Sequence, residues 1–277
     1  MSIPNLFEHR YIALVDRVIV EGEDRQTRAG PTKMLFGEKL FVADIWSEGF
    51  PIITNRRMWP RGIWGELAAF IKGFTRLCEF NDLGCSYWDA NAAAWVQNLG
   101  IPKSQHRVGK IYGAQWRNFD GVDQLDDLVD NLIHDRWSRR HLLTTYNPSE
   151  LDQACLPPCH LLAQFSVSDD LGLDCCVYMR SVDLCVGLPT DIVLYATLME
   201  LLGKKCGYYA RNLTFMFGDT HVYKNHLDLW EIQRQRPPHT LPVLDLDEDT
   251  HLFTFNNTGI ALDGYKHHDQ IQYPFNV

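Results

Sequence analysis

The chain has 277 residues, of which 45% are hydrophobic and 22% charged, a composition typical of a globular protein with a sizeable core. Its 26 basic and 35 acidic residues give a net charge of −9, which argues against a nonspecific surface for nucleic acid polymers. The N-terminus lacks a basic segment followed by an apolar one, and no long apolar run occurs, so we expect a cytoplasmic protein without membrane contact. We find no linker or repeat, and we expect one domain over 1–277.

Two helices are predicted in the first half of the chain. Apolar residues recur at helical spacing over 61–74 and again over 121–137, where the outer face of the helix is acidic. From residue 140 onward, the spacing of apolar residues changes from the helical period to one typical of strands. Residues 140–148 predict a strand closed by Asn-Pro, and residues 160–183 predict two strands joined by a polar turn that contains glycine.

The second half predicts a buried helix between strands. Residues 189–207 begin with Pro-Thr-Asp, end at Gly207 and are apolar almost all round, so this helix should be central. A strand is predicted over 211–219, followed by a helix over 220–236 that the next prolines end. Because helices and strands mix without strict βαβ alternation, the predicted class is α+β, with a large mixed sheet flanked by helices.

Cys159 stands out among the eight cysteines. No CxxC pair and no Cys/His cluster at structural zinc spacing occurs, so no metal site is expected, and several cysteines lie within apolar runs. Cys159 lies between Pro158 and His160, and arginines occur at the ends of predicted strands, in SRRH (138–141) and YMRSVD (178–183). Converging guanidinium groups bind phosphate and stabilise a thiolate, although a lone Pro-Pro-Cys-His is more often a turn with a buried cysteine.

Several segments in one order resemble the thymidylate synthase family. They are DRQTRAG, FPIITNRR, WGELAAF, YWDAN, IYGAQWR, SRRHLLTTYNPSEL, LPPCH, RSVDLCVGLPTDI and GDTHVYKNH. The similarity runs over residues 24–238, and LPPCH and GDTHVYKNH are its most specific parts. The resemblance implies a homodimer that uses 5,10-methylenetetrahydrofolate, with Cys159 as the thiolate that adds to C6 of a pyrimidine nucleotide.

The resemblance also implies a role for each matching polar residue. The phosphate ligands would be Arg28, Arg139, Arg140, Arg180 and Ser181. Arg139 and Arg140 would reach across the homodimer into the partner's site, and Arg25 is an alternative to Arg28. The sugar 3'-hydroxyl would bind His221 and Tyr223, and Glu66 would organise proton transfer around the base. Other polar residues lining the site would be Tyr112, His160 and Asn147, and the folate would contact Asp183, Trp88 and Gly187.

The chain departs from the family at the residue that contacts the base. Where the family has asparagine after Gly-Leu/Val-Pro-Phe, this chain has Asp191 in GLPTDI. Uracil presents an N3–H donor and an O4 acceptor, whereas cytosine presents an N3 acceptor and an N4 amine donor. A carboxyl group that shares one proton with N3 fits cytosine, and an ionised carboxylate facing O4 of uracil would not. In this respect the chain resembles the deoxycytidylate hydroxymethylases of phages.

Two further departures concern the folate side of the predicted site. Asn91 stands where a tryptophan is expected, and Thr190 stands where the family has phenylalanine. Both changes would make the pocket wetter, so water rather than hydride would complete the transferred group. The C-terminal YPFNV nevertheless resembles the family's closing tail, so methyl transfer stays open.

These observations predict a deoxycytidylate (dCMP) 5-hydroxymethyltransferase. Its expected location is the cytoplasm, and this includes the cytoplasm of a phage-infected host cell. The alternatives are methylation of dCMP, a CMP-specific hydroxymethylase and a divergent synthase that uses dUMP. A nucleotide-binding regulator without turnover is a further alternative, but binding alone would not require Cys159 or Glu66.

Overall fold

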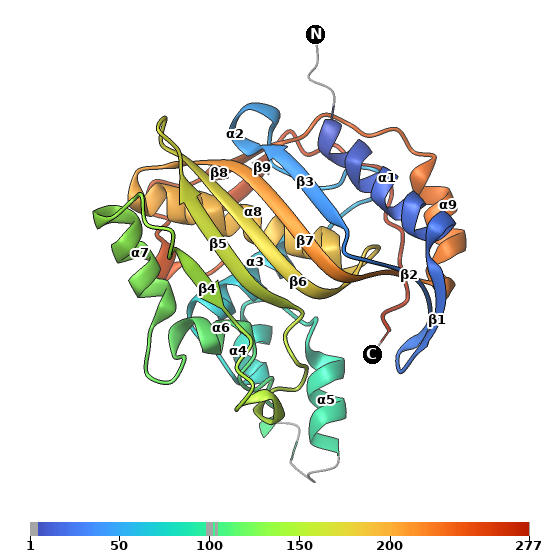
Figure 1. Cartoon of the computed structure of the whole chain (residues 1–277), viewed down its shortest axis with the longest axis horizontal. Helices are drawn as coiled ribbons and strands as arrows, with labels where there is room; N and C mark the ends of the chain where they lie inside the picture. The colour runs from blue at the N-terminus through green and yellow to red at the C-terminus, as the bar shows by residue number, and fades with distance from the viewer. Residues whose placement is uncertain (1–4, 98–101, 103–104, 277) are drawn as a thin grey trace.

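The computed structural model describes residues 5–97, 102 and 105–276 (Figure 1). The helices are α1 (Leu6–Glu21), α2 (Ile45–Glu48), α3 (Pro60–Ile71), α4 (Leu77–Asp82), α5 (Asp89–Gln97), α6 (Tyr112–Arg117), α7 (Gln124–His134), α8 (Gly187–Cys206) and α9 (Leu227–Arg234). The strands are β1 (Glu23–Thr27), β2 (Gly30–Phe36), β3 (Lys39–Asp44), β4 (Leu142–Thr144), β5 (His160–Val167), β6 (Gly172–Asp183), β7 (Tyr209–Tyr223), β8 (Val243–Leu246) and β9 (Ile260–Asp263). None of the described helices is long and apolar enough to span a bilayer.

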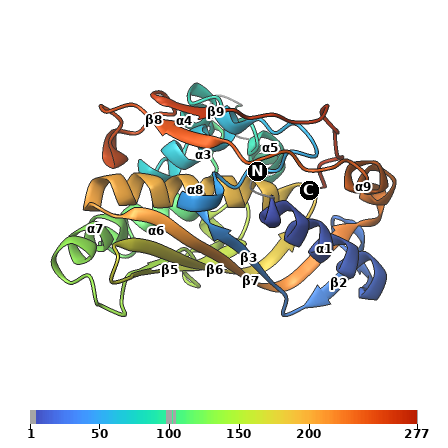
Figure 2. The same ribbon diagram turned by 90° about the horizontal axis from the view of Figure 1, so that it is seen from above.

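The main sheet is mixed. Its order is β1-β2-β7-β6-β5-β4, with β3 also paired to β7, and β8 and β9 form a separate hairpin. The pairing of β6 with β7 is parallel, and the other pairs are antiparallel. Helix α8 lies along one face of the sheet, and α3 and the β8–β9 hairpin lie beyond it (Figure 2). The α+β class predicted from the sequence is confirmed.

Three predicted helices are confirmed with small shifts of their ends. They are α3, α7 and α8. As expected from its apolar surface, α8 is buried along most of its length, and Gly207 ends it in the left-handed conformation at φ 82°. The predicted hairpin over 160–183 is β5 and β6, whereas the strand over 140–148 is reduced to the three residues of β4.

The predicted helix over 220–236 is wrong in its first part. Residues up to Tyr223 belong to β7, and α9 begins only at Leu227. Strand β7 pairs with β2 on one side and β6 on the other through this stretch, and Thr220 and Val222 are buried. β-Branched and aromatic residues with partners on both sides favour a strand over the helical pattern. His221 and Tyr223 therefore lie on a strand of the main sheet.

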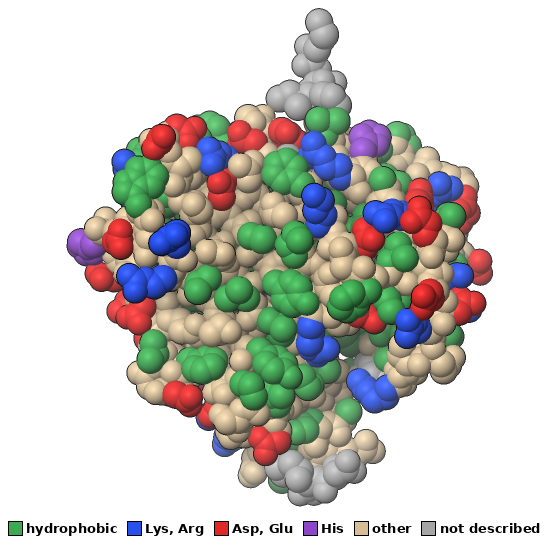
Figure 3. Space-filling view, viewed as in Figure 1, with side chains coloured by type: hydrophobic (Ala, Val, Ile, Leu, Met, Phe, Trp, Pro, Cys, Tyr) green, Lys and Arg blue, Asp and Glu red, His purple; other side chains and the backbone are tan. Residues whose placement is uncertain are grey.

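The second face of the main sheet carries exposed apolar side chains. Phe41, Tyr178 and Met216 are each about 40% exposed, and Cys176 beside them is exposed as well. Tyr178 and Met216 are register partners on β6 and β7. Figure 3 shows hydrophobic side chains gathered over the middle of this face, which we call the open sheet face. A hydrophobic patch of this kind is typical of an interface between protein chains.

Candidate active site

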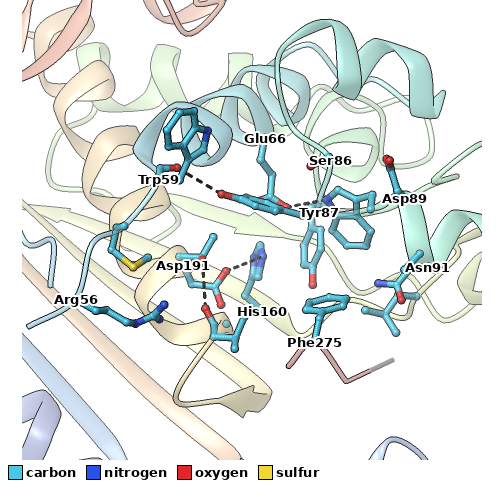
Figure 4. Close-up of a pocket in the computed structure, with 18 of the residues that line it drawn as sticks. Arg56, Trp59, Glu66, Ser86, Tyr87, Asp89, Asn91, His160, Asp191 and Phe275 are labelled. Carbon is cyan, nitrogen blue, oxygen red and sulfur yellow. Dashed lines mark hydrogen bonds and ion pairs between the residues drawn. The ribbon is translucent and has the colours of Figure 1, made fainter. Parts of the chain in front are cut away.

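A cavity of about 610 Å³ lies at the N-terminal end of α8. Its walls include six residues that the sequence predicts to be in the site, namely Glu66, Trp88, Tyr112, His160, Gly187 and Asp191. They come from α3, the segment before α5, α6, β5 and α8, so the cavity forms where these elements converge (Figure 4). A volume of this size is ordinary for a small-molecule site.

Cys159 lies directly before β5 and next to the cavity wall. Its backbone N–H donates to the Tyr112 hydroxyl at 2.9 Å, and the Arg180 Nη2 atom lies 3.8 Å from its Sγ. Burial raises the pKa of the thiol, the Arg180 guanidinium lowers it, and the nearby Asp191 raises it further. Within this single chain burial is the largest influence, so Cys159 rests as a thiol.

Arg180 is held against the loop of residues 157–159, directly before β5. Its Nε donates to Pro158 O and its Nη2 to Pro157 O, both at 2.7 Å. Within the described residues its Nη1 makes no hydrogen bond, so this nitrogen remains available to an anion. The neighbouring Ser181 is partly exposed on β6.

Two tyrosines hold the His160 ring in place. Its ring stacks on Tyr112 with centroids 3.8 Å apart, and its Nδ1 lies 2.7 Å from the Tyr195 hydroxyl. The register between β5 and β6 shifts just after His160, as in a β-bulge, which is a device that redirects side chains beside sites. Burial lowers the pKa of His160 to about 3, so the imidazole is neutral. Its Nε2 lies 3.9 Å from Asp191 Oδ1, which is too long for a hydrogen bond.

Glu66 lies on the buried face of α3 and points into the cavity. Trp88 Nε1 donates to its Oε1 at 2.7 Å. Burial raises the pKa of Glu66 to about 7, although the Trp88 hydrogen bond opposes this shift. At neutral pH the group is therefore close to half protonated, which suits a residue that both gives and takes a proton.

Asp191 projects from the second turn of α8 into the same cavity. Burial raises the pKa of its carboxyl group well above its ordinary value, and the neighbouring Glu66 raises it further. No hydrogen bond to this carboxyl group comes from any residue that the structure describes. In its protonated form, which burial favours, Asp191 offers one donor and one acceptor to whatever fills the cavity.

His221 and Tyr223 lie at the end of β7, beside the end of β6. His221 Nδ1 contacts Asp219 Oδ1 at 2.6 Å, and the rings of His221 and Tyr223 meet edge to face. Burial raises the pKa of the Tyr223 hydroxyl. Arg28, in the exposed turn between β1 and β2, is close enough to lower that pKa. Arg25 is instead paired with Glu23 at 2.6 Å, so Arg28 is the better placed of the two arginines.

Four further predicted site residues lie outside the cavity wall. Arg139 and Arg140 are exposed in the loop between α7 and β4 and do not line the cavity. Asn147 is buried, accepts from the Ser149 backbone and hydroxyl, and donates to Glu150, so it stabilises its own turn. Asp183 lies at the end of β6, where it accepts from the Cys185 backbone N–H at 2.9 Å.

Other residues complete the cavity without a role in the sequence-based predictions. Trp59, Tyr87 and Phe275 provide aromatic surface, and Arg56 and Arg57 provide positive charge (Figure 4). The adjacent arginines and tryptophan in TNRRMWP were a possible signal, since an exposed guanidinium beside an aromatic ring often marks a binding surface. Tyr195 could not be found in this way, because it looks like any apolar residue of α8.

Comparison with known proteins gives a consistent set of relatives. A family model described as thymidylate synthase matches residues 9–277. The probable thymidylate synthase of Escherichia phage T5 is 35% identical over 95% of this chain and 98% of its own length. The thymidylate synthase of Pseudomonas syringae pv. tomato is 32% identical over 97% of this chain and 99% of its own length. A bifunctional dihydrofolate reductase-thymidylate synthase of Paramecium tetraurelia is 31% identical over 96% of this chain and 60% of its own.

Proposed function

The chain belongs to the thymidylate synthase family, and from this premise we propose that it transfers a one-carbon unit to C5 of dCMP and releases 5-hydroxymethyl-dCMP. Members of the family are folate-dependent pyrimidine C5 methyltransferases, and their one-carbon donor is 5,10-methylenetetrahydrofolate. They act on a small nucleotide and are typically dimers. The proposal concerns the base, the product and the role of each residue.

The neutral carboxyl group of Asp191 carries the proposal. With cytosine, its O–H donates to N3 and its carbonyl oxygen accepts from the N4 amine, so both partners are satisfied in a buried site. With uracil, the same acid group accepts from N3–H and donates to O4. Both bases therefore have complementary partners in the ground state, and the preference arises during the reaction.

The preference for cytosine follows from where charge develops. When a thiolate adds to C6, electron density moves to N3 of cytosine or to O4 of uracil. The imine-type N3 is a much stronger base than a carbonyl oxygen, so the Asp191 proton can pass to N3 and neutralise that charge. At O4 of uracil, the less basic carbonyl oxygen leaves the proton on Asp191, so the developing charge receives only a hydrogen bond. Asp191 thus stabilises the transition state for cytosine selectively.

Cys159 is the proposed nucleophile. Because burial holds it as a thiol, positive charge must arrive before attack, and Arg180 provides part of that charge from 3.8 Å. Tyr112 fixes the backbone of the nucleophile through its hydroxyl. The Sγ atom forms a bond to C6, the proton at C5 leaves when the one-carbon unit is attached, and Sγ is expelled at the end.

Glu66 and His160 serve the proton transfers around the base. With a pKa near 7, Glu66 can donate or accept a proton at neutral pH, directly or through water. His160 remains neutral and, because Tyr195 contacts its Nδ1, its Nε2 is directed toward Asp191. We assign His160 a positioning role for the carboxyl group and the base.

The deoxyribose and phosphate would bind at the ends of β6 and β7. His221 and Tyr223 would contact the 3'-hydroxyl, and Arg180, Ser181 and Arg28 would contact the phosphate. This matches the family's deoxynucleotide pattern, so we propose dCMP over CMP. Comparable kcat/KM values for the two nucleotides would contradict this part of the proposal.

The residues of the cavity fit a folate. Trp88, Tyr87 and Phe275 offer aromatic surface to a flat ring system, and Arg56 and Arg57 offer charge to its carboxylates. Asp183 and Gly187 lie at the same end of the sheet. When bound, the folate supplies a carbon at the oxidation level of formaldehyde.

Asn91 and Thr190 line the cavity with polar groups, and this supports water as the completing reagent. Water then provides the oxygen and one hydrogen of the hydroxymethyl group, and no hydride is consumed. The methyl product would instead require hydride from the folate. The end of the tail, Val277, lies outside the described residues.

The open sheet face supports a homodimer, and the exposed Arg139 and Arg140 support shared sites. Both arginines are exposed in the loop between α7 and β4, and neither lines the cavity of its own chain. In a symmetric dimer, the same loop of a second chain can deliver both groups to the phosphate.

The experiment that tests the proposed function identifies the product by mass. Purified protein is incubated with 5,10-methylenetetrahydrofolate and either dCMP or dUMP. We expect dCMP to gain a hydroxymethyl group without formation of dihydrofolate. A product lighter by one oxygen, together with dihydrofolate, would establish methylation, and equal turnover of dUMP would establish a divergent synthase.

A separate assay distinguishes an enzyme from a nucleotide-binding regulator. Exchange of the C5 hydrogen of dCMP with solvent deuterium requires addition of the nucleophile at C6. Wild-type protein should exchange it, and Cys159→Ser should bind dCMP without exchange. Exchange by the variant would show that Cys159 is not the nucleophile.

A further inference from the structure

Three side chains with metal-ligating atoms meet where β6 and β7 end. Asp183 ends β6, Cys185 follows it in the connection to α8, and His226 lies between β7 and α9. One ligand atom from each lies within 4.8 Å of the other two, and His226 Nδ1 is 3.8 Å from Asp183 Oδ1. Cys185 and His226 are fully buried, and Asp183 is 19% exposed. Among the described residues no other group of three or more meets this geometry.

The histidine in this cluster has an unused lone pair. Its Nε2 lies 2.8 Å from the Pro274 carbonyl oxygen and 3.2 Å from Asn276 Nδ2. Because the carbonyl oxygen can only accept and makes the shorter contact, we assign the ring hydrogen to Nε2. Nδ1 is therefore a bare acceptor, and it has no hydrogen-bond partner although the side chain is completely buried. A ring N–H bound to a backbone carbonyl is the usual support for a histidine whose other nitrogen binds a metal.

We propose that Asp183, Cys185 and His226 bind a Zn²⁺ ion, or a divalent ion with the same ligand preference. These residues would provide three ligands, and water would occupy the fourth position. Thiolate, imidazole and carboxylate are the three ligand types that zinc takes in proteins. The combination of soft and borderline ligands excludes Mg²⁺ and Ca²⁺, which prefer oxygen.

The distances suit a site that contracts slightly around the ion. With bonds of about 2.0–2.3 Å, a tetrahedral Zn²⁺ ion places its ligands roughly 3.5 Å apart. The pair His226 Nδ1 and Asp183 Oδ1, at 3.8 Å, is already near that separation. Asp183 also accepts from the Cys185 backbone N–H, which holds the carboxylate and the thiol on one side of a tight turn.

The charges also balance. A thiolate and a carboxylate neutralise a divalent ion, and the nearby Arg56 donates to the Cys185 carbonyl oxygen rather than to the ligand atoms. The simplest alternative is a Cys185 S–H group that donates to His226 Nδ1. This alternative makes the opposite prediction, because such a pair binds no metal.

The proposed metal would compete with the folate, and this consequence rests on the proposed function. Asp183 is the proposed folate ligand, and its carboxylate cannot serve both partners. Added Zn²⁺ should therefore raise the KM for methylenetetrahydrofolate and leave the KM for dCMP unchanged. In Cys185→Ser the same concentration of Zn²⁺ should have little effect.

The deciding experiment uses the metal alone and no turnover. Metal-free, reduced, full-length protein is titrated with Co²⁺, whose bond to a thiolate produces a charge-transfer absorption. We expect one equivalent per chain, loss of the band when Zn²⁺ is added, and loss of the band in both Cys185→Ser and His226→Gln. Competition with a chromophoric chelator should show Zn²⁺ affinity reduced at least about 100-fold in Cys185→Ser.

Two matched variants control for the other thiols. Cys206→Ser removes a partly buried thiol at the end of α8, and Cys159→Ser removes the proposed nucleophile. Both should keep the band, and circular dichroism should show that every variant is folded. Absence of the band in wild-type protein, or its persistence in Cys185→Ser, would overturn the proposal.

Discussion

At the scale of single residues, burial determines the chemistry of the cavity. Asp191 lies in the second turn of α8, beyond the first turn where a helix dipole stabilises negative charge by about 0.3–1 kcal/mol. Desolvation in the cavity outweighs that contribution and raises the pKa of the carboxyl group, which favours its protonated form. Glu66 experiences the same burial but retains one hydrogen bond, from Trp88, so its pKa stops near 7.

The variant Asp191→Asn tests how the base is selected. The amide cannot pass a proton to N3 of cytosine, but it satisfies N3–H and O4 of uracil. We expect the ratio of kcat/KM for dUMP to that for dCMP to rise on the order of 10²–10⁴-fold. A variant that keeps its cytosine preference would show that Asp191 does not select the base.

The pH profile provides the matched control for this variant. Wild-type activity on dCMP should fall as pH rises through the raised pKa of Asp191, because the donated proton is then lost. The alkaline fall caused by Asp191 should be absent from the dUMP activity of Asp191→Asn. A fall of equal size in both proteins would assign it to another group.

Glu66→Gln tests the cost of burying a carboxyl group. The folded pKa of about 7 lies above the ordinary 4.5, so wild-type stability is complete below pH 4.5 and declines as pH rises toward 7. Above pH 7 the free energy of unfolding of the wild type is lower than at low pH by on the order of 3 kcal/mol. Glutamine still accepts from Trp88 and does not titrate. Urea unfolding at pH 5 and pH 8 should therefore show the variant gaining stability over wild type at the higher pH; an unchanged difference would contradict the assignment.

At the scale of elements, the crossing of α3 and α6 positions the nucleophile. A Cβ atom at Gly113 would lie 2.2 Å from Phe70 Cα, so the two helices can approach only with glycine there. Tyr112, one residue earlier, accepts from the Cys159 N–H. The close crossing of two helices thus fixes the backbone of Cys159, the proposed nucleophile.

Gly113→Ala should separate α6 from α3. We expect a loss of stability of at least about 2 kcal/mol and a marked loss of C5 hydrogen exchange, because Tyr112 moves from Cys159. Gly187→Ala is the matched control for stability, since its Cβ would meet no atom closer than 3.9 Å. Thermal unfolding of the two variants provides the comparison. Equal midpoints would show that the crossing tolerates a methyl group.

Elements with a strong period could be predicted from the sequence, and those defined by pairing could not. Helix α8 is apolar and ends at Gly207, so its position was evident. The stretch from Thr220 to Tyr223 joins a strand because β2 and β6 flank it, and pairing between distant segments leaves no local signal. Likewise, the motif around Cys159 predicted a nucleophile from local sequence. The cluster of Asp183, Cys185 and His226 could not be predicted, because it forms only where the ends of β6 and β7 meet.

At the scale of the whole molecule, the cavity lies within one chain, but two of the proposed phosphate ligands lie away from it. The cavity residues predicted from motifs converge, whereas Arg139 and Arg140 lie on the outside. Motif similarity identified both groups equally, and in the proposed homodimer a second chain would bring them together. The missing information is the geometry of assembly.

Hybrid dimers test this arrangement. Arg139→Ala and Cys159→Ser should each be inactive alone. After the two are refolded together in equal amounts, half the dimers are hybrids with one complete site, so about one quarter of wild-type activity should return. Activity of the mixture is measured after sedimentation has verified dimers. A fully active monomer, or a mixture that stays inactive, would contradict shared sites.

The open sheet face also has a consequence for the time course of assembly. A single folded chain exposes Phe41, Tyr178 and Met216, and in the proposed homodimer a second chain would cover them. Folding of each chain is unimolecular, whereas completion of the proposed sites is bimolecular. After dilution from denaturant, fluorescence should recover at a rate independent of protein concentration. Enzyme activity should lag behind it, and the lag should shorten in proportion as the concentration of chains rises.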